Sequence, residues 1–417
     1  MVWVMNSAPE SVASPRFQDI PIPRRDVVEA LREDFADDGA SSAKLSSLCE
    51  RLLALYHYEL HGELELLKRD YAPFNPDLDH PQAQLGPASK RARAEEFSTH
   101  LRSVLERGNY EQLNEEDVHH AFVERSLFPL KVVVDTSVYR EAIFYARGET
   151  VRTAEVPKWY GLSRDTIDVP TFERVCLFIR FKGEDELGLT RAQLKRIKFE
   201  PGTTILKLFR NIPKADLEIL FPNCEPRMRA SDKLFFGVPA LVGGIPVVAR
   251  LMPAVLAIAI LLGLRQGEID TTSIIAGLSG LVVLGAYLFR QWGKFKHRRM
   301  MFNKELSDNL YFRNLDNNEG VLTRLVDEAE EEECKEVLLA YVHLLAAGEA
   351  GLAASALDER VERWVRERFE VEVDFEVSDA LTKLEDFDLI VRGEGDRFCA
   401  RPLQAAIARL DARWQSL

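Results

Sequence analysis

The run "YFRNLDNNEGVLTRLVDEAEEEECKE", residues Tyr311 to Glu336, places six carboxylates between Asp327 and Glu333, directly before the thiol of Cys334. Apolar residues around the carboxylates repeat with helical spacing. We predict one helix over the first part of the run and a second helix that begins at the acidic block. Because a helix N-terminus attracts negative charge, the pattern favours a solvated acidic helix start. A divalent-cation site and a catalytic site are the alternatives.

The most apolar part of the chain lies upstream, over residues 234–292. Two apolar blocks, 245–264 and 273–292, flank a short polar stretch, and each has the length of about 20 residues that crosses a bilayer. Both blocks are apolar on all faces, whereas a helix in the core of a globular domain keeps a polar stripe. The pattern therefore predicts a transmembrane helical hairpin, with a buried hairpin in a globular domain as the alternative.

Basic residues flank the predicted hairpin on both sides, whereas the connecting loop has few. By the positive-inside rule, this distribution predicts that both termini are cytoplasmic. It predicts a multi-pass protein of the bacterial inner (cytoplasmic) membrane, or of the mitochondrial inner membrane in a eukaryote. The lipid bilayer is then one partner. The residues expected at the membrane interface are Arg250, Arg290, Lys294, Lys296, Arg298 and Arg299, and a pore-lining Arg250 is the alternative to one that reaches the headgroups.

Composition excludes some classes of function. The chain has 417 residues and a formal net charge of −13, which argues against a general nucleic-acid binder because such proteins neutralise phosphates. The five cysteines are scattered without a C-x-x-C pair, a pattern typical of reduced thiols rather than of a disulfide framework. The N-terminus has neither the basic region nor the apolar core of a signal peptide.

The sequence predicts an α+β membrane protein with several parts. Helical periodicity dominates the first part, β-branched and aromatic runs the next, and two apolar spans follow. The predicted parts are a disordered N-terminus (1–19), a helical region (20–128), a small α+β domain (129–233), the hairpin (234–292), a basic helical connector (293–330) and a winged-helix-like domain (331–417).

The C-terminal part shows the order helix, helix, helix, hairpin, which resembles a winged helix. In DNA-binding versions the third helix is basic, whereas here that helix carries Asp379, Glu385, Asp386 and Asp388 against one lysine, Lys383. We therefore expect no nucleic-acid binding and assign this domain to packing or protein docking.

Histidines supply the weak candidates for a metal site. His57 and His61 are four residues apart, so they share a helix face and could grip a metal. The order His-Tyr-Glu-Leu-His matches neither zincin signature. Together with acidic residues they form the weak candidate set His57, His61, Glu330, Glu331 and Glu333. We predict no metal, no cofactor and no catalytic residues.

Several stretches together resemble a family of membrane proteins with a domain of unknown function, which includes the mitochondrial transmembrane protein 143. The matching stretches are "IPIPRRDVVEAL", "DYAPFNPD", "KLFRNIPKADLEILFP", "YLFRQW" and the run that begins at "LYFRNLDNNEG". The resemblance extends from about Ile20 to Ala340. It implies two membrane spans with globular flanks, and it implies no reaction.

Three functions fit these observations. The first is a non-enzymatic membrane-anchored docking or assembly protein, with a protein partner or a second copy of the chain. The second is a membrane-associated enzyme that acts on lipid or a membrane-bound substrate. The third is the subunit of an oligomeric channel or transporter.

Overall fold

The computed structural model describes most of the chain outside the apolar blocks. The described residues are 17, 19–35, 39–78, 86–114, 131–158, 163–188, 190, 197, 199–227, scattered positions from 275 to 308, 310–393 and 395–417. They divide into two compact units, each taken by itself below. The first unit comprises Met1–Val123, Thr136–Leu217 and Arg313–Leu417, and the second comprises Glu124–Asp135 and Glu218–Phe312.

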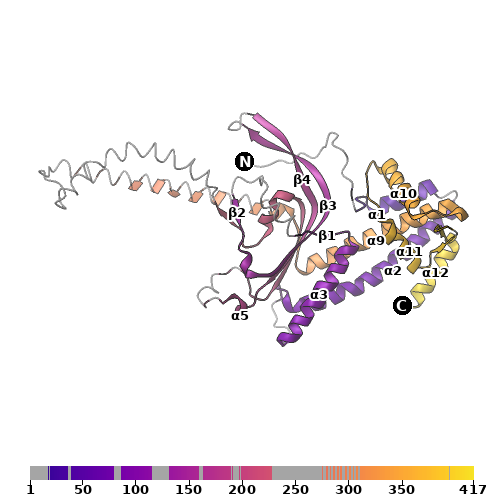
Figure 1. The fold of residues 1–417 in the computed structure, drawn as a ribbon, viewed down its shortest axis with the longest axis horizontal. Helices are drawn as coiled ribbons and strands as arrows, with labels where there is room; N and C mark the ends of the chain where they lie inside the picture. Colours follow the sequence, from indigo (N-terminus) through magenta and orange to yellow (C-terminus); the bar gives the residue numbers. More distant parts are fainter. Residues whose placement is uncertain are drawn as a thin grey trace. The chain divides into compact units, whose positions relative to one another are not determined.

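A five-stranded antiparallel sheet forms one layer of the first unit (Figure 1). The strand order is β1-β3-β4-β5-β7. Strands β3 and β4 form a long hairpin in which Phe178 pairs with Ile143. On its other edge β4 pairs with β5, where Phe178 lies opposite Leu206. Successive apolar residues of β4 are buried whichever face they point to, because such a continuous run lies inside the fold on both sides. The strands are β1 (Glu111–Gln112), β3 (Tyr139–Lys158), β4 (Ser163–Phe181), β5 (Thr204–Pro213) and β7 (Asn314–Asn317).

Three helices of the first unit, α1 (Arg24–Phe35), α2 (Gly39–Tyr71) and α3 (Pro87–Arg107), pack on a fourth, α9 (Glu319–Ala347). Their leucines share one apolar core with Cys176, Phe178 and Leu208 from a single face of the sheet. Helix α9 runs antiparallel to α2, since Tyr71 contacts Asn318 at one end and His57 contacts Glu330 further along. The core between helices and sheet therefore forms around α9.

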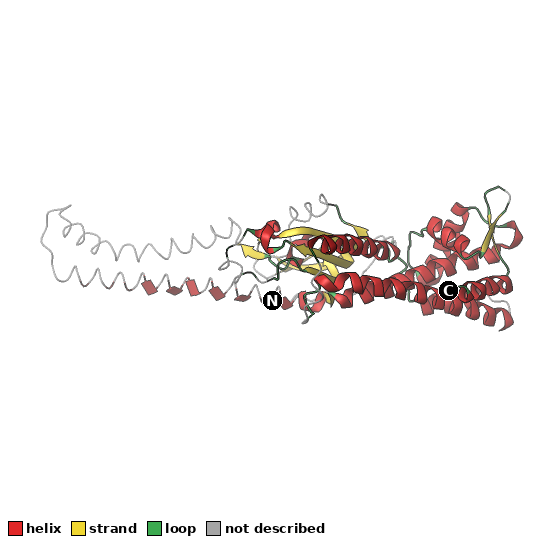
Figure 2. Ribbon diagram, turned by 90° about the horizontal axis from the view of Figure 1, so that it is seen from below, coloured by secondary structure: helices red, strands yellow, loops and turns green. Residues whose placement is uncertain are grey.

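The C-terminal elements pack on the parts of α2 and α9 that are distant from the sheet (Figure 2). Helix α10 (Ala354–Phe369) and helix α11 (Val377–Asp386) lie on α9, and helix α12 (Leu403–Gln415) lies on α2. A two-stranded hairpin of β8 (Ile390–Arg392) and β9 (Phe398–Ala400) joins α11 to α12. Residues 331–417 thus contain the end of α9, then α10, α11, the hairpin and α12, and the winged-helix-like domain of the sequence analysis stays a prediction.

Short elements complete the description. In the second unit, β2 (Lys131–Val133) pairs antiparallel with β6 (Glu225–Arg227). The described residues also form the helical turn α5 (Glu184–Leu187) and the 3-10 segments η1 (Ala72–Phe74), η2 (Thr136–Val138), η4 (Lys214–Leu220) and η5 (Gly348–Ala350).

The predicted membrane protein is contradicted. Among the residues that the structure describes, no helix is both long enough and apolar enough to cross a bilayer. The long helices α2, α3 and α9 instead carry charged residues along their length and turn their leucines toward the shared core. The α+β class stands, whereas the membrane class and the localisation in an inner membrane were wrong. The predicted spans 245–264 and 273–292 lie outside the described residues, apart from isolated positions in the second.

Helix α9 also differs from the prediction of two consecutive helices. It is continuous from Glu319 to Ala347 and crosses the predicted boundary between residues 330 and 331. After Gly320 the sequence has neither glycine nor proline until Gly348, so nothing interrupts the backbone hydrogen bonds. The acidic block therefore lies in the middle of a helix rather than at its N-terminus.

Candidate functional site

The acidic block of α9 is buried at its C-terminal end, whereas Asp327 at its start is exposed. Glu332, Glu333 and Glu336 are exposed by 3% or less, as is Lys335 between them. A buried carboxylate needs a partner of opposite charge or a hydrogen-bond donor, because desolvation of an isolated charge is costly. The prediction of a solvated helix start was therefore wrong, and the partners of these carboxylates define the site.

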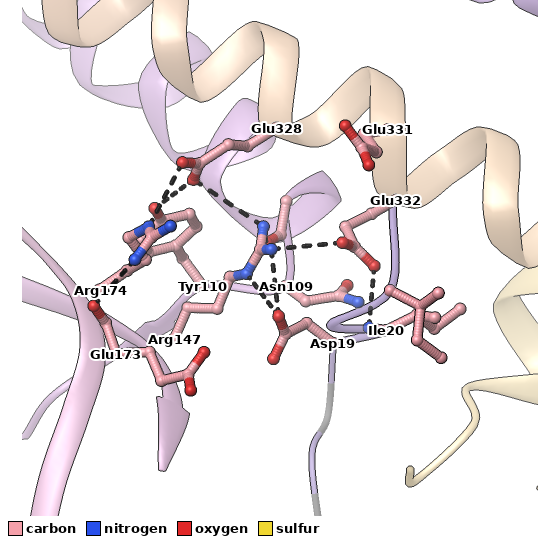
Figure 3. A network of polar contacts seen from close by, with 12 residues as sticks. Asp19, Ile20, Asn109, Tyr110, Arg147, Glu173, Arg174, Glu328, Glu331 and Glu332 are labelled. Atoms are coloured by element: carbon pink, nitrogen blue, oxygen red, sulfur yellow. Dashed lines mark hydrogen bonds and ion pairs between the residues drawn. The ribbon is translucent and has the colours of Figure 1, made fainter. Parts of the chain in front are cut away.

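One guanidinium joins the sheet to the middle of α9 (Figure 3). Arg147 of β3 lies 3.1 Å from Asp19 Oδ2 and 3.2 Å from Glu332 Oε1, and it donates to the carbonyl of Gly108. Burial by itself lowers the pKa of Arg147, but Glu332 and Asp19 outweigh it and hold that pKa above its usual value. Arg147 is therefore a permanent cation at the centre of this network.

Glu328 extends the same network toward the sheet, one turn before Glu332 (Figure 3). Its Oε2 accepts a 2.6 Å hydrogen bond from the buried hydroxyl of Tyr110, and its Oε1 lies 3.5 Å from both Arg174 and Arg324. Burial, followed by the charge of Glu328, raises the pKa of Tyr110. The hydroxyl is therefore fixed as a donor.

The segment that leads into α1 is held by α9 through backbone contacts. Glu332 Oε2 accepts from the amide of Ile20 at 3.1 Å, and Lys335 Nζ donates to the carbonyls of Ile20 and Ile22. Glu331 accepts from the amide of Arg24 at 3.1 Å. These contacts satisfy backbone groups that would otherwise be buried without partners, so α9 fixes where α1 begins.

A second cluster lies toward α11. Lys383 Nζ is 2.7 Å from Glu333 Oε2, 2.7 Å from Glu336 Oε2 and 2.5 Å from Asp379 Oδ2. Arg107, at the end of α3, is 2.7 Å from Glu333 Oε1. The amide of Asn109 donates to Glu336 Oε1 at 3.0 Å. Glu333 and Glu336 thus share Lys383, and each has one further partner, Arg107 for Glu333 and Asn109 for Glu336.

An open cavity lies on the other side of α9, where α1, α2 and α9 meet. It has a volume of about 510 Å³, and its apolar lining is Pro23, Val28, Leu53, Leu338 and the two thiols Cys49 and Cys334. The charged residues around it are Arg24, Arg25, Glu29, Arg32, Glu50 and Glu331. We call this cavity the three-helix groove.

The two thiols of the three-helix groove are poor nucleophiles. Burial, with a smaller contribution from the neighbouring Cys334, raises the pKa of Cys49 to about 12, and burial raises that of Cys334 to about 12. Nucleophilic attack needs the thiolate. At neutral pH both side chains remain protonated and behave as small apolar groups.

The structure brings part of the weak metal set together. His57 Nδ1 lies 2.9 Å from Glu330 Oε2, and the rings of His57 and His61 stack at 6.1 Å. Glu330 also contacts Arg24, whereas Glu331 and Glu333 are held by the separate partners given above. The described residues include no group of three or more His, Cys, Asp or Glu side chains placed to hold a metal ion.

The residues predicted at a membrane interface fall in the second unit. Arg250, Lys294, Arg298 and Arg299 lie outside the described residues, and Arg290 and Lys296 are isolated described positions on helical backbone. The carboxylates of the acidic block pair with Arg24, Arg107, Arg147, Lys335 and Lys383.

The partners of the acidic block were not predicted from the sequence. Arg147 follows three buried residues of β3, and Lys383 is the lone cation of an acidic helix. A charged residue on the apolar side of an amphipathic element is the signal that could have identified both, because such a residue is buried only when it is paired. The sequence contains that signal but does not indicate which carboxylate is the partner.

Comparison with known families finds one domain. Residues 172–320 match the model of a family described as a protein of unknown function (DUF3754). The match begins in β4 and ends at the second residue of α9, so it covers less than half of the chain. This match confirms the expected domain of unknown function. It does not link the chain to the transmembrane protein 143 family. No solved structure matches the chain.

Proposed function

We propose that this chain is a non-enzymatic docking protein that holds an amphipathic helix of a protein partner in the three-helix groove. The observation that carries the proposal is the lining of the groove, which combines apolar side chains with charged residues of both signs. A helix with one apolar stripe and charged flanks is complementary to such a surface.

The spacing of the groove residues supports a helical occupant. Arg25, Val28, Glu29 and Arg32 recur at the intervals of one face of α1. Helix α2 contributes Leu53, and α9 contributes Leu338 from the opposite side. Helix-in-groove recognition uses such a cleft between helices, with apolar anchors at every turn of the ligand.

The state of the polar groups favours docking over catalysis. A general base or nucleophile must be free to approach the substrate, whereas Glu331 accepts the amide of Arg24 and the thiols of Cys49 and Cys334 stay protonated. The walls can offer charge complementarity, which favours correct partners and rapid association.

A selected peptide tests the proposal. A display library of helical peptides is selected on the full chain, and the affinity of each selected peptide is measured by fluorescence anisotropy. Leu53→Trp fills the floor of the groove, so we expect at least an approximately tenfold loss of affinity, equivalent to about 1.4 kcal/mol.

The matched control is Leu66→Trp, on the same helix but 39% exposed and outside the groove. It should leave the affinity unchanged. The proposal is overturned if the library yields no binder, or if the selected peptides bind Leu53→Trp as tightly as the unaltered chain.

A further inference from the structure

Three arginines lie side by side across the sheet. Arg147 of β3 is paired with Arg174 of β4, and Arg174 is paired in turn with Arg210 of β5. Residues paired directly across antiparallel strands share one face, with Cβ atoms about 4.5–5.5 Å apart, and like charges in such pairs are destabilising. Cys176, two residues along β4, belongs to the core that the sheet shares with the helices. The row of arginines therefore lies on the face of the sheet that the helices cover.

Helix α9 adds one carboxylate and one further cation to this row. Figure 3 shows Arg147 and Arg174 extending from the sheet toward Glu328. The Oε1 atom of Glu328 is 3.5 Å from Arg174 Nε and 3.5 Å from Arg324 Nε, which lies one turn earlier on α9. The other oxygen, Oε2, is 3.9 Å from Arg147 and accepts the hydrogen bond from Tyr110. Three guanidinium groups thus surround one carboxylate.

The neighbouring carboxylates contact Arg147 rather than the outer cations. Asp19 lies 3.1 Å and Glu332 lies 3.2 Å from Arg147. Arg174 meets the next residue of its own strand through the backbone, because its Nη1 donates to the carbonyl of Glu173 at 3.2 Å. Positive charge is therefore concentrated at the side of the network that Arg174 occupies.

Two donors at this side lack an acceptor. The Nε atoms of Arg174 and Arg324 are buried, and neither makes a hydrogen bond within the described part of the chain, because the 3.5 Å to Glu328 Oε1 is too long. A buried donor without an acceptor is costly. The two side chains are nevertheless 31% and 40% exposed, so a ligand from solvent can reach them.

We propose that Arg174 and Arg324 form an anion site that binds a phosphate group. A guanidinium presents its N–H donors in a planar fork that matches the oxygens of a phosphate. The two forks come from different elements, β4 and α9, whereas Glu328 reaches both with the same oxygen. A tetrahedral group with several oxygens can accept from both forks at once, and its double negative charge matches the two cations.

The surroundings of Glu328 allow a second anion beside it. Glu328 repels a phosphate, but its own charge is held by the hydroxyl of Tyr110 and by Arg147, so it does not depend on the two outer guanidinium groups alone. Neither Arg174 nor Arg324 lines the three-helix groove. The anion site therefore stands independently of the docking proposal.

The test is isothermal titration calorimetry of the full chain with inorganic phosphate at pH 8, at constant ionic strength because salt screens exposed charges. We expect saturable binding of one phosphate per chain. Arg174→Gln and Arg324→Gln each remove one fork, and each should weaken binding at least about tenfold, since hydrogen bonds to charged groups are among the stronger ones. Phenyl phosphate identifies the source of the group: equal affinity assigns a monoester, and affinity for inorganic phosphate alone assigns the free ion.

The matched control is Arg392→Gln, which removes an exposed guanidinium that pairs with Glu385. It should leave the Kd for phosphate unchanged. Arg174→Lys keeps the charge but not the planar fork, so it should bind phosphate more weakly than the unaltered chain does.

A second measurement covers variants that do not fold. In the unaltered chain with ¹⁵N-labelled arginine, phosphate should shift the Nε–H signals of Arg174 and Arg324 in NMR spectra. The proposal is overturned if neither saturable heat nor these shifts are seen. It is also overturned if Arg174→Gln and Arg324→Gln bind phosphate as tightly as Arg392→Gln.

Discussion

Glu336 and His343 lie on the same helix, two turns apart, and both are almost fully buried, yet their surroundings differ completely. Glu336 contacts an ammonium and an amide. His343 lies between the rings of Phe35 and Trp364, and neither ring nitrogen has a hydrogen-bond partner among the described residues. Burial favours the neutral form in both, so the pKa of Glu336 is raised to about 7 and that of His343 is lowered to about 3.

One helix therefore carries two groups whose contributions to stability depend on pH in opposite directions. The pKa of His343 falls from 6.5 because of burial and then because of Arg360, so the unfolded chain binds the proton more tightly. Stability due to His343 therefore rises with pH between about 3 and 6.5, whereas stability due to Glu336 falls between about 4.5 and 7. Where the windows overlap, the two contributions cancel.

The largest effect is expected when Glu336 loses the ammonium with which it pairs. Lys383→Met leaves Glu333 and Glu336 without their shared ammonium, and loss of one partner from a buried pair costs about 3–5 kcal/mol. We expect that loss in the free energy of unfolding at pH 8, measured with urea. At pH 5 the loss should be smaller, because the carboxyl of Glu336 is then protonated.

Lys68→Met is the matched control for Lys383→Met. Lys68 pairs with Glu65 at 3.4 Å on the outer face of α2, and an exposed pair contributes about 1 kcal/mol or less. Equal losses in the free energy of unfolding for the two variants would show that the buried contacts of Lys383 stabilise the fold no more than a surface ion pair does.

An effect of intermediate size is expected at His343, which packs against aromatic rings. His343→Leu removes two unpaired buried nitrogens, and an unsatisfied buried polar group costs about 1–3 kcal/mol. We expect the variant to be more stable than the unaltered chain at pH 7, and the gain to grow toward pH 5. Thermal unfolding at both values measures it.

Removal of His343 also sharpens the comparison, because the pH dependence of Glu336 is then unopposed. His343→Leu should lose stability steadily from pH 5 to 7. His61→Leu, on the exposed face of α2, is its control. A variant His343→Leu that is less stable at every pH would show that the ring nitrogens are satisfied in solution.

The smallest effect is expected at His57, one of the weak candidates for a metal ligand. His57→Ala breaks the contact with Glu330, but the side chain of His57 is 69% exposed. An exposed pair of this kind contributes about 1 kcal/mol or less. We expect a change in the urea midpoint within that range and no change in metal content by elemental analysis. Loss of a stoichiometric ion would replace this interpretation with a metal site.

Local patterns predicted much of the secondary structure of the first unit. The apolar spacing of "RRDVVEALREDF" corresponds to α1, and the β-branched run "FERVCLFIRF" corresponds to the buried half of β4. Both depend on periodicity over a few residues. Periodicity did not predict that α9 is continuous. An acidic run gives the same sequence pattern at the start of a helix and in the middle of a long helix.

The sequence by itself determined the α+β class, most helix and strand types, and the concentration of carboxylates on one segment. Only the tertiary structure decided that Glu332 meets Arg147, 185 residues away, and that Glu336 meets Lys383. The physical reason is that periodicity reports which face of an element is apolar, whereas the partner of a buried charge depends on how distant elements pack. An acidic run without its partners therefore predicts a solvated surface, and with them it forms the centre of the fold.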